Sequence, residues 1–210
     1  MNRETFEHAV LTLLDRGATP RTLNLRAVAR EVGCAHTNLY NYVSSYPELL
    51  WWTVRAALGR LMELTEDAGA PDGTDLIDGY VRFAVAHPAW YRLIWIDALE
   101  GDPPPEVAAY LAVPQQAFLA WMARRTGGTA GDEGFLRDVS LVHGYLHGEL
   151  AAFVAGRLAV RPDEEVARIR AGVARLFPLL FDTEYAPAGT EPTATTSTAT
   201  PSTGTKGENS

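Results

Sequence analysis

Residues 24–50 read NLRAVAREVGCAHTNLYNYVSSYPELL, and this stretch decides the fold. Apolar residues recur from Leu25 to Val32 at the spacing of one helical face, and Asn24 before them is of a type that caps helix N-termini. Gly33 follows, and glycine adopts the left-handed conformation that ends a helix at little cost. The pattern predicts a short helix over 25–32 that ends in a tight turn.

A second short helix is predicted from about Ala35 to Val43, with Leu39 and Val43 facing inward and Pro47 opening the next helix. Two helices joined by a three- to four-residue turn can place the second helix in the DNA major groove. The outward residues all carry groups that hydrogen-bond a base edge or a phosphate, and they are His36, Thr37, Asn38, Tyr40, Asn41 and Tyr42.

The stretch resembles the N-terminal domain of the TetR/AcrR family of bacterial transcriptional repressors, over roughly residues 3–60. That family carries an apolar helix ending in glycine, a capped second helix, a Gly-Val-Ser turn, a Leu-Tyr-x-x-Phe recognition helix and a Lys-x-Glu-Leu-Leu entry to the fourth helix. The matching positions here are Gly17, Asn24, Ala29, Gly33, Leu39, Tyr40, Glu48, Leu49 and Leu50.

Three positions depart from the family pattern. Ala35 stands where the family has a capping Ser, a loss that typically costs ~1 kcal/mol. Val43 replaces the aromatic at the end of the recognition helix, and Tyr46 replaces a phosphate-facing Lys. The resemblance nevertheless implies a homodimer on a palindromic double-stranded DNA operator, with these candidate contacts: Asn24, Arg26, His36, Thr37, Asn38, Tyr40, Asn41, Tyr42 and Tyr46.

Charge is divided unevenly along the chain. Residues 1–62 hold seven Arg and five acidic residues, for a net charge of +2, whereas residues 63–210 carry −10. Arg21, Arg26 and Arg30 lie near the expected DNA face, which is the electrostatic footprint of DNA binding or, alternatively, an ordinary solvated helix surface.

Composition narrows the class of protein. The chain has 210 residues, 47% of them hydrophobic, which is enough for one or two globular domains. No apolar run reaches the ~18 residues of a membrane span, and the polar N-terminus is unlike a signal peptide, so we expect a cytoplasmic protein without a membrane partner. A single cysteine, Cys34, excludes an intramolecular disulfide.

The whole chain is predicted to be all-α, since no segment alternates with a period of two. We expect a three-helix helix-turn-helix domain at 1–50, a helical ligand-binding and dimerisation domain at 51–183, and a disordered tail at 184–210. Eight Thr fall between residues 190 and 205 of that tail, which serves solubility or carries a modification or partner site. The expected helices cover 6–14, 25–32, 35–43, 47–67, 75–86, 88–97, 107–126 (one helix kinked at Pro114, or two), 133–157 and 163–182.

Two later stretches, FAVAHPAWYRLIW at 83–95 and LVHGYLHGEL at 141–150, resemble the C-terminal domain of the TetR subgroup with a His-Gly pair (the WHG type). The resemblance implies a small-molecule effector, and dimerisation through the last two long helices. Clustered aromatic residues either pack the core or line a pocket for a largely apolar effector. The candidate ligand contacts are Phe83, His87, Trp90, Tyr91, Trp95, Phe118, Trp121, Met122, His143 and His147.

His143 and His147 stand four residues apart on one helix face, which is also metal-ligand spacing. Gly144 occupies the place where a zinc-protease helix has glutamate, and we expect no metal site and no cofactor. Packing or hydrogen bonding, contact with an organic ligand, and metal binding remain the alternatives, in that order. Gly144 and Gly148 form a flat strip, which suits a dimer interface or leaves room for a ligand.

Three classes of function remain open. The first is a ligand-responsive DNA-binding regulator, most often a repressor. The second is an enzyme, but the chain shows no phosphate loop, nucleophile elbow or zinc signature, so we expect no catalytic residue. The third is a helical small-molecule-binding protein whose helix-turn-helix no longer reads DNA.

Overall fold

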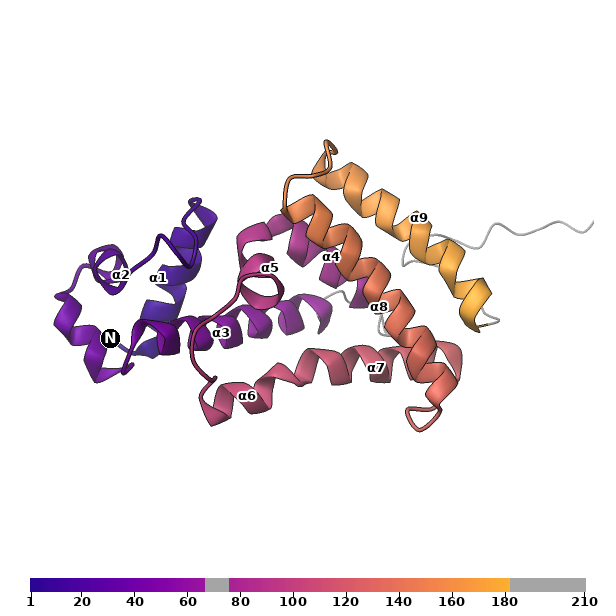
Figure 1. Cartoon of the computed structure of the whole chain (residues 1–210), viewed down its shortest axis with the longest axis horizontal. Coiled ribbons are helices and arrows are strands. Elements are labelled where there is room, and N and C mark those ends of the chain that lie inside the picture. Colours follow the sequence, from indigo (N-terminus) through magenta and orange to yellow (C-terminus); the bar gives the residue numbers. More distant parts are fainter. Residues whose placement is uncertain (67–75, 182–210) are drawn as a thin grey trace, which may run out of the picture.

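The computed structural model describes residues 1–66 and 76–181, and this part of the chain contains helices and no strand (Figure 1). The all-α prediction is therefore confirmed, whereas the predicted tail at 184–210 lies outside the described residues. In chain order the elements are α1 (Arg3–Asp15), α2 (Leu25–Val32), the 3-10 helix η1 (His36–Asn41), α3 (Tyr46–Glu66), α4 (Leu76–Ala86), α5 (Pro88–Trp95), α6 (Pro105–Leu111), α7 (Val113–Thr126), α8 (Glu133–Val154) and α9 (Pro162–Phe181).

Side-chain caps and glycines fix the ends of the first two helices. Asn2 Oδ1 accepts the Thr5 amide at 3.0 Å at the start of α1, and Asn24 Oδ1 accepts the Ala27 amide at 3.0 Å at the start of α2. Gly33 ends α2 with a φ of 76°, a left-handed conformation that glycine adopts without strain. The predicted cap and stop of α2 thus stand where the sequence placed them.

The predicted second helix at 35–43 needs a correction, because the chain forms a shorter 3-10 helix, η1. The Asn38 amide bonds to the Ala35 carbonyl at 2.9 Å and the Tyr42 amide bonds to the Leu39 carbonyl at 2.8 Å, which are i→i+3 bonds. Ala35 supplies no side-chain cap, and asparagine side chains compete with helical bonding. Leu39 and Val43 still point into the core, as predicted.

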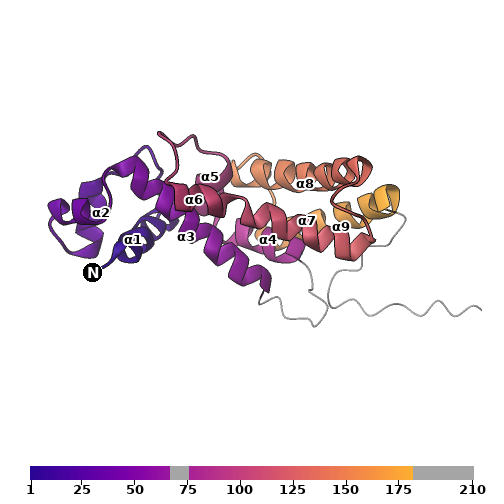
Figure 2. The ribbon, with the colours of Figure 1, turned by 90° about the horizontal axis from the view of Figure 1, so that it is seen from below.

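The 21 residues of α3 connect the two halves of the molecule. Figure 2 shows α3 leaving the region of α1 and α2 and ending below α4 in this view. It packs on α1 and also on α4, α5 and α6. One hydrophobic core runs from Phe6 to Phe177 across this helix. The predicted domain boundary at residues 50 and 51 falls within α3.

Prolines divide the middle of the chain. Pro88 is the first residue of α5, which begins directly after α4. The first turn of a helix uses no backbone N–H as a donor within the helix, so a proline, which has none, is favoured there. α6 and α7 are two helices that share Ala112 as their junction residue, with Pro114 in the first turn of α7. The sequence left one kinked helix or two helices open at this point, and the structure has two.

α8 and α9 lie side by side at the end of the molecule farthest from α2 (Figure 1). α8 ends at Val154 rather than at 157, because Gly156 takes a φ of 67° that stops the helix. Gly172 in α9 permits close packing, since a Cβ there would overlap the Tyr145 hydroxyl of α8. None of the described helices is both long and apolar enough to cross a membrane.

An ion pair joins α4 to α9. The Arg170 guanidinium donates to both carboxylate oxygens of Asp78, and Arg82 Nε donates to Asp78 Oδ2 at 3.1 Å. Burial alone raises the pKa of the Asp78 carboxyl, but bonds from Arg170 and then Arg82 outweigh it and hold the pKa below its ordinary value of 3.8. The pair fixes the position of the last helix against the core.

Replacing Asp78 by asparagine is expected to lower the free energy of unfolding at pH 7 by about 1–3 kcal/mol, because charge-assisted bonds are lost. A folded-state pKa below the unfolded one adds stability above the ordinary carboxyl pKa, and this stability disappears as the pH falls through the folded-state value. Denaturant unfolding at pH 7 and below pH 4 should therefore show the gap between wild type and Asp78→Asn closing in acid.

Asp163→Asn serves as the control, because Asp163 pairs with Arg161 at 3.6 Å on an exposed surface. Such pairs contribute little to stability. If the difference in free energy of unfolding between wild type and Asp78→Asn does not change with pH, the carboxylate of Asp78 does not stabilise the fold in the way described.

Candidate functional site

The outer surface of η1 carries polar side chains that form no hydrogen bond within the described part of the protein. His36, Thr37, Asn38, Tyr40 and Asn41 are exposed, and Tyr40 is 56% exposed despite its aromatic ring. Within the described residues, none of the five side chains forms a hydrogen bond. Side chains of these types, presented together on one short helix, are available for base edges and phosphates.

Three exposed arginines lie on or just before α2, the helix that packs on η1. Arg21, Arg26 and Arg30 are exposed, and none of them pairs with an acidic residue among those described. Arg16 differs, because its guanidinium meets Glu31 at 2.8 Å. Unpaired arginines next to an unbonded polar face favour contact with a polyanion.

Three predicted DNA contacts also bond within the protein. The Asn24 side-chain oxygen accepts the hydrogen bond that caps α2. Tyr42 is half-buried against Phe6, with ring centroids 5.3 Å apart, and its hydroxyl donates to the Met1 carbonyl at 2.9 Å. Tyr46 donates to the Pro20 carbonyl at 2.8 Å, and burial raises the pKa of its hydroxyl. Each holds η1 or its neighbours in position.

The start of α3 is fixed by the Glu48 carboxylate. It accepts the Ser44 amide at 2.7 Å and the Trp52 indole N–H at 3.2 Å, and the Ser45 hydroxyl accepts the Glu48 amide at 3.2 Å. The bonds from Ser44 lower the pKa of the Glu48 carboxyl more than burial raises it. The connection between η1 and α3 is therefore rigid.

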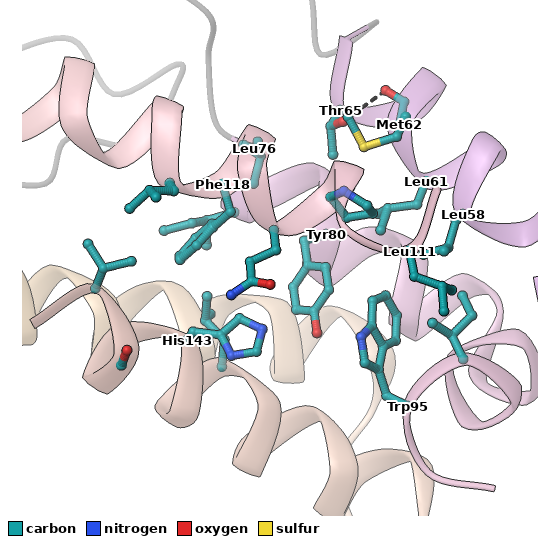
Figure 3. A pocket seen from close by; sticks show the side chains of 18 of the residues that line it. Leu58, Leu61, Met62, Thr65, Leu76, Tyr80, Trp95, Leu111, Phe118 and His143 are labelled. Atoms are coloured by element: carbon teal, nitrogen blue, oxygen red, sulfur yellow. Dashed lines mark hydrogen bonds between the residues drawn. The ribbon is translucent and has the colours of Figure 1, made fainter. Parts of the chain in front are cut away.

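A cavity of about 700 Å³ lies between α3, α4, α5, α6, α7 and α8 (Figure 3). Its size is in the ordinary range for small-molecule sites. The lining is mostly aliphatic and aromatic and consists of Leu58, Leu61, Met62, Thr65, Leu76, Ile77, Tyr80, Ile94, Trp95, Leu111, Pro114, Gln115, Phe118, Leu119, Leu136, Val139, Ser140, His143 and Leu146.

Three of the ten predicted ligand contacts line this cavity, namely Trp95, Phe118 and His143. The other seven are placed elsewhere. The interior positions are Phe83, Tyr91, Met122 and Trp121, and Trp121 packs edge-on to Phe177. His87, Trp90 and His147 lie outside the lining and are described below.

The cavity also uses residues that the sequence did not single out. α3 contributes Leu58, Leu61, Met62 and Thr65, and α4 contributes Tyr80. Apolar residues occur all around α3, which signals a helix that is covered on several sides but not which side faces a cavity. That choice depends on the positions of α6 and α7.

Two tyrosines and a histidine form a hydrogen-bond chain that begins in the cavity wall with Tyr80. The Tyr80 hydroxyl donates to the Tyr91 hydroxyl at 3.2 Å, and the Tyr91 hydroxyl lies 2.7 Å from His147 Nδ1. Burial raises the pKa of Tyr91 to about 12 and that of Tyr80 well above its ordinary value, so both stay protonated at neutral pH. The Tyr80 proton therefore points to the Tyr91 oxygen, and the tautomer of His147 sets which of Tyr91 and His147 donates to the other.

His143 stands at the cavity edge. Its ring lies parallel to that of His147, with centroids 6.3 Å apart, and edge-on to Phe118 at 5.8 Å. Burial, and then the neighbouring His147, lower the pKa of His143, so the imidazole is neutral at pH 7. Across the described residues, no three histidine, cysteine or carboxylate side chains gather in a way that would hold a metal ion.

His87 and Trp90 join α5 to α1 instead of lining the cavity. Their rings stack 4.0 Å apart, and the Trp90 indole N–H donates to the Leu11 carbonyl of α1 at 3.3 Å. His87 Nδ1 lies 3.7 Å from Asp15 Oδ1 of the same helix. α5 therefore contacts α1 at its beginning and the cavity at Ile94 and Trp95.

No protein-family model matches the chain, and no curated protein matches it. Solved structures do: one is the crystal structure of a TetR transcriptional regulator from Rhodococcus sp. RHA1, with a TM-score of 0.53 and 18% sequence identity. The likeness covers 85% of this chain and 98% of that one. At this identity it shows that the two proteins share a fold.

Tyr91→Phe is expected to lower the free energy of unfolding by about 1–2 kcal/mol, because it leaves the Tyr80 proton and His147 Nδ1 without their partner. Denaturant titration measures the change. Tyr40→Phe removes the same hydroxyl from an exposed ring and should change stability by less than about 0.5 kcal/mol. Equal effects of the two variants would mean that the chain of bonds adds nothing.

Proposed function

We propose that this chain is a TetR-family transcriptional regulator: a cytoplasmic homodimer that binds a palindromic DNA operator, most simply as a repressor, and releases it when a small, largely apolar effector binds. It has no catalytic residue in this proposal and needs no cofactor. The shared fold supports the family, and the residues of η1 and of the cavity support the two binding roles.

The observation that carries the proposal is the surface of η1. Five exposed polar side chains of η1 form no internal hydrogen bond, and the neighbouring α2 segment carries three exposed arginines without acidic partners. In the rest of the chain, by contrast, arginines often pair with acids, as Arg168 does with Glu149 and Glu165. A surface that leaves its donors and cations free fits a partner with phosphates and base edges.

Regulation would act through α3. This helix carries the DNA-binding end of the molecule at Tyr46 and the cavity wall at Leu58, Leu61, Met62 and Thr65. A ligand that fits the cavity better in one orientation of α3 favours that orientation, and with it one spacing of the two η1 segments in a dimer.

Dimerisation through α8 and α9 is supported by their exposed apolar residues. Leu141 is 53% exposed and Leu179 is 79% exposed. A Cβ at Gly144 or Gly148 would meet no atom within 4 Å, so this strip of α8 is open to a partner helix. An open, partly apolar face on the two terminal helices suits an isologous contact.

A second candidate is a helical small-molecule-binding protein whose helix-turn-helix no longer reads DNA. The 3-10 geometry of η1 and the missing cap at Ala35 favour it. DNA binding separates the two candidates, because both predict a ligand in the cavity.

The first experiment is an anisotropy titration of the purified chain against DNA flanking its own gene, at two salt concentrations. We expect sequence-dependent binding that weakens with salt. Asn41→Ala should weaken specific binding about tenfold. Arg26→Ala should remove one phosphate contact, which lowers the slope of log affinity against log salt concentration by about 1.

The control is His8→Ala, an exposed position on α1 away from η1, which should bind DNA like wild type. The second candidate is favoured if the protein binds the flanking DNA no better than random DNA and a genome-wide selection also finds no specific site. Normal binding by Asn41→Ala and Arg26→Ala together would remove η1 as the contact surface.

Leu141→Arg is expected to shift the protein from dimer to monomer in sedimentation analysis, because it puts a charge into an apolar interface. Operator affinity should fall with it, since a monomer holds only one half-site. Leu64→Arg is the matched control on α3, where Leu64 is also exposed. A Leu141→Arg variant that stays dimeric would place the interface elsewhere.

A further inference from the structure

The cavity offers no charge to a ligand. None of its lining residues within the described chain is an acid, a lysine or an arginine. The inner wall is formed by buried residues such as Ile77, Leu58 and Leu146. A ligand with a permanent charge would lose its hydration there without gaining a counter-ion, which is unfavourable. His143 does not change this balance, because burial lowers its pKa and keeps the ring neutral.

The small hydroxyl groups of the lining are already satisfied. The Thr65 hydroxyl donates to the Met62 carbonyl at 2.8 Å, and the Ser140 hydroxyl donates to the Leu136 carbonyl at 2.8 Å. The Gln115 amide also belongs to the lining, and it forms no hydrogen bond with any described residue. The Trp95 indole N–H and the His143 ring likewise form none. These two side chains and Tyr80 point toward the same region of the cavity (Figure 3). Tyr80, Trp95 and His143 therefore form one polar place in the cavity, and Gln115 offers a further amide group.

Tyr80 determines which group fits that place. Its proton is committed to the Tyr91 oxygen, so the Tyr80 oxygen can only accept a further bond. Donation along such a chain also makes that oxygen a stronger acceptor. A ligand atom beside it must donate, whereas the Trp95 N–H requires an atom that accepts. A hydroxyl group does both.

We propose that the cavity binds an uncharged, mostly apolar molecule with a hydroxyl group, which donates to Tyr80 and accepts from Trp95. The effector role of this molecule rests on the proposed regulator function, but its binding does not. The aliphatic remainder of the ligand fills the space between α3, α7 and α8.

The test uses three probes of one chain length with the full-length protein: 1-decanol, its isomer methyl nonyl ether, and decanoate. Binding is followed by calorimetry and by tryptophan fluorescence. We expect decanol to bind about five- to tenfold more tightly than the ether, which accepts but does not donate, and at least tenfold more tightly than the anion. Absence of decanol binding, or decanoate binding as tight as that of decanol, would overturn the proposal.

Two tyrosine variants test the role of Tyr80. Tyr80→Phe should reduce the preference for decanol over the ether to about onefold, while the affinity for the ether stays the same. Tyr91→Phe keeps the Tyr80 hydroxyl but frees its proton, which can then donate to the ether oxygen. The ether should therefore bind more tightly, and the preference for decanol should fall because the ether affinity has risen. A preference that survives Tyr80→Phe would show that another group makes the contact.

Failure of this inference and failure of the regulator proposal give different results. Selective decanol binding without specific DNA binding would leave the ligand class standing and remove the regulator. Specific DNA binding without any preference among the probes would do the reverse.

Discussion

The structure depends on one continuous helix. α3 spans 21 residues, about 30 Å, and its backbone bonds make it stiff along that length. Tyr46 and Glu48 fasten its first turn to the loop before α2 and to the segment after η1. Its last two turns form a wall of the cavity. Because the helix does not bend easily, a change in its direction at the cavity would be carried to η1.

A second connection limits how α3 can move. α5 contacts α1 through Trp90 and lies near it through His87, and the other end of α5 reaches the cavity with Trp95. Tyr91 in the middle of α5 bonds to Tyr80 of α4 and to His147 of α8. The cavity and the end of the molecule that holds α1 and η1 are thus linked both by a long helix and by a short one, and polar bonds fix the short helix on two sides.

The buried polar chain has a cost and a consequence. Tyr80, Tyr91 and His147 would otherwise bond to water, and all three are satisfied only when their helices keep these relative positions. The chain therefore specifies one arrangement of α4, α5 and α8. The same arrangement turns the Tyr80 oxygen into a fixed acceptor. In the proposed binding mode, the same side chains therefore serve both stability and ligand choice.

The sequence by itself determined the helical class, the caps at Asn24 and Gly33, the inward positions of Leu39 and Val43, and the start of α5 at Pro88. These features depend on local geometry, in which one residue type satisfies one backbone requirement. The sequence also named Trp95, Phe118 and His143 as ligand contacts, and these three line the cavity. Only the tertiary structure decided that η1 is a 3-10 helix, that Tyr80 and α3 line the cavity, and that Phe83, Tyr91 and Met122 are core. Aromatic side chains look alike in sequence whether they face a cavity or a neighbouring helix, because that choice depends on the packing of segments far apart in the chain.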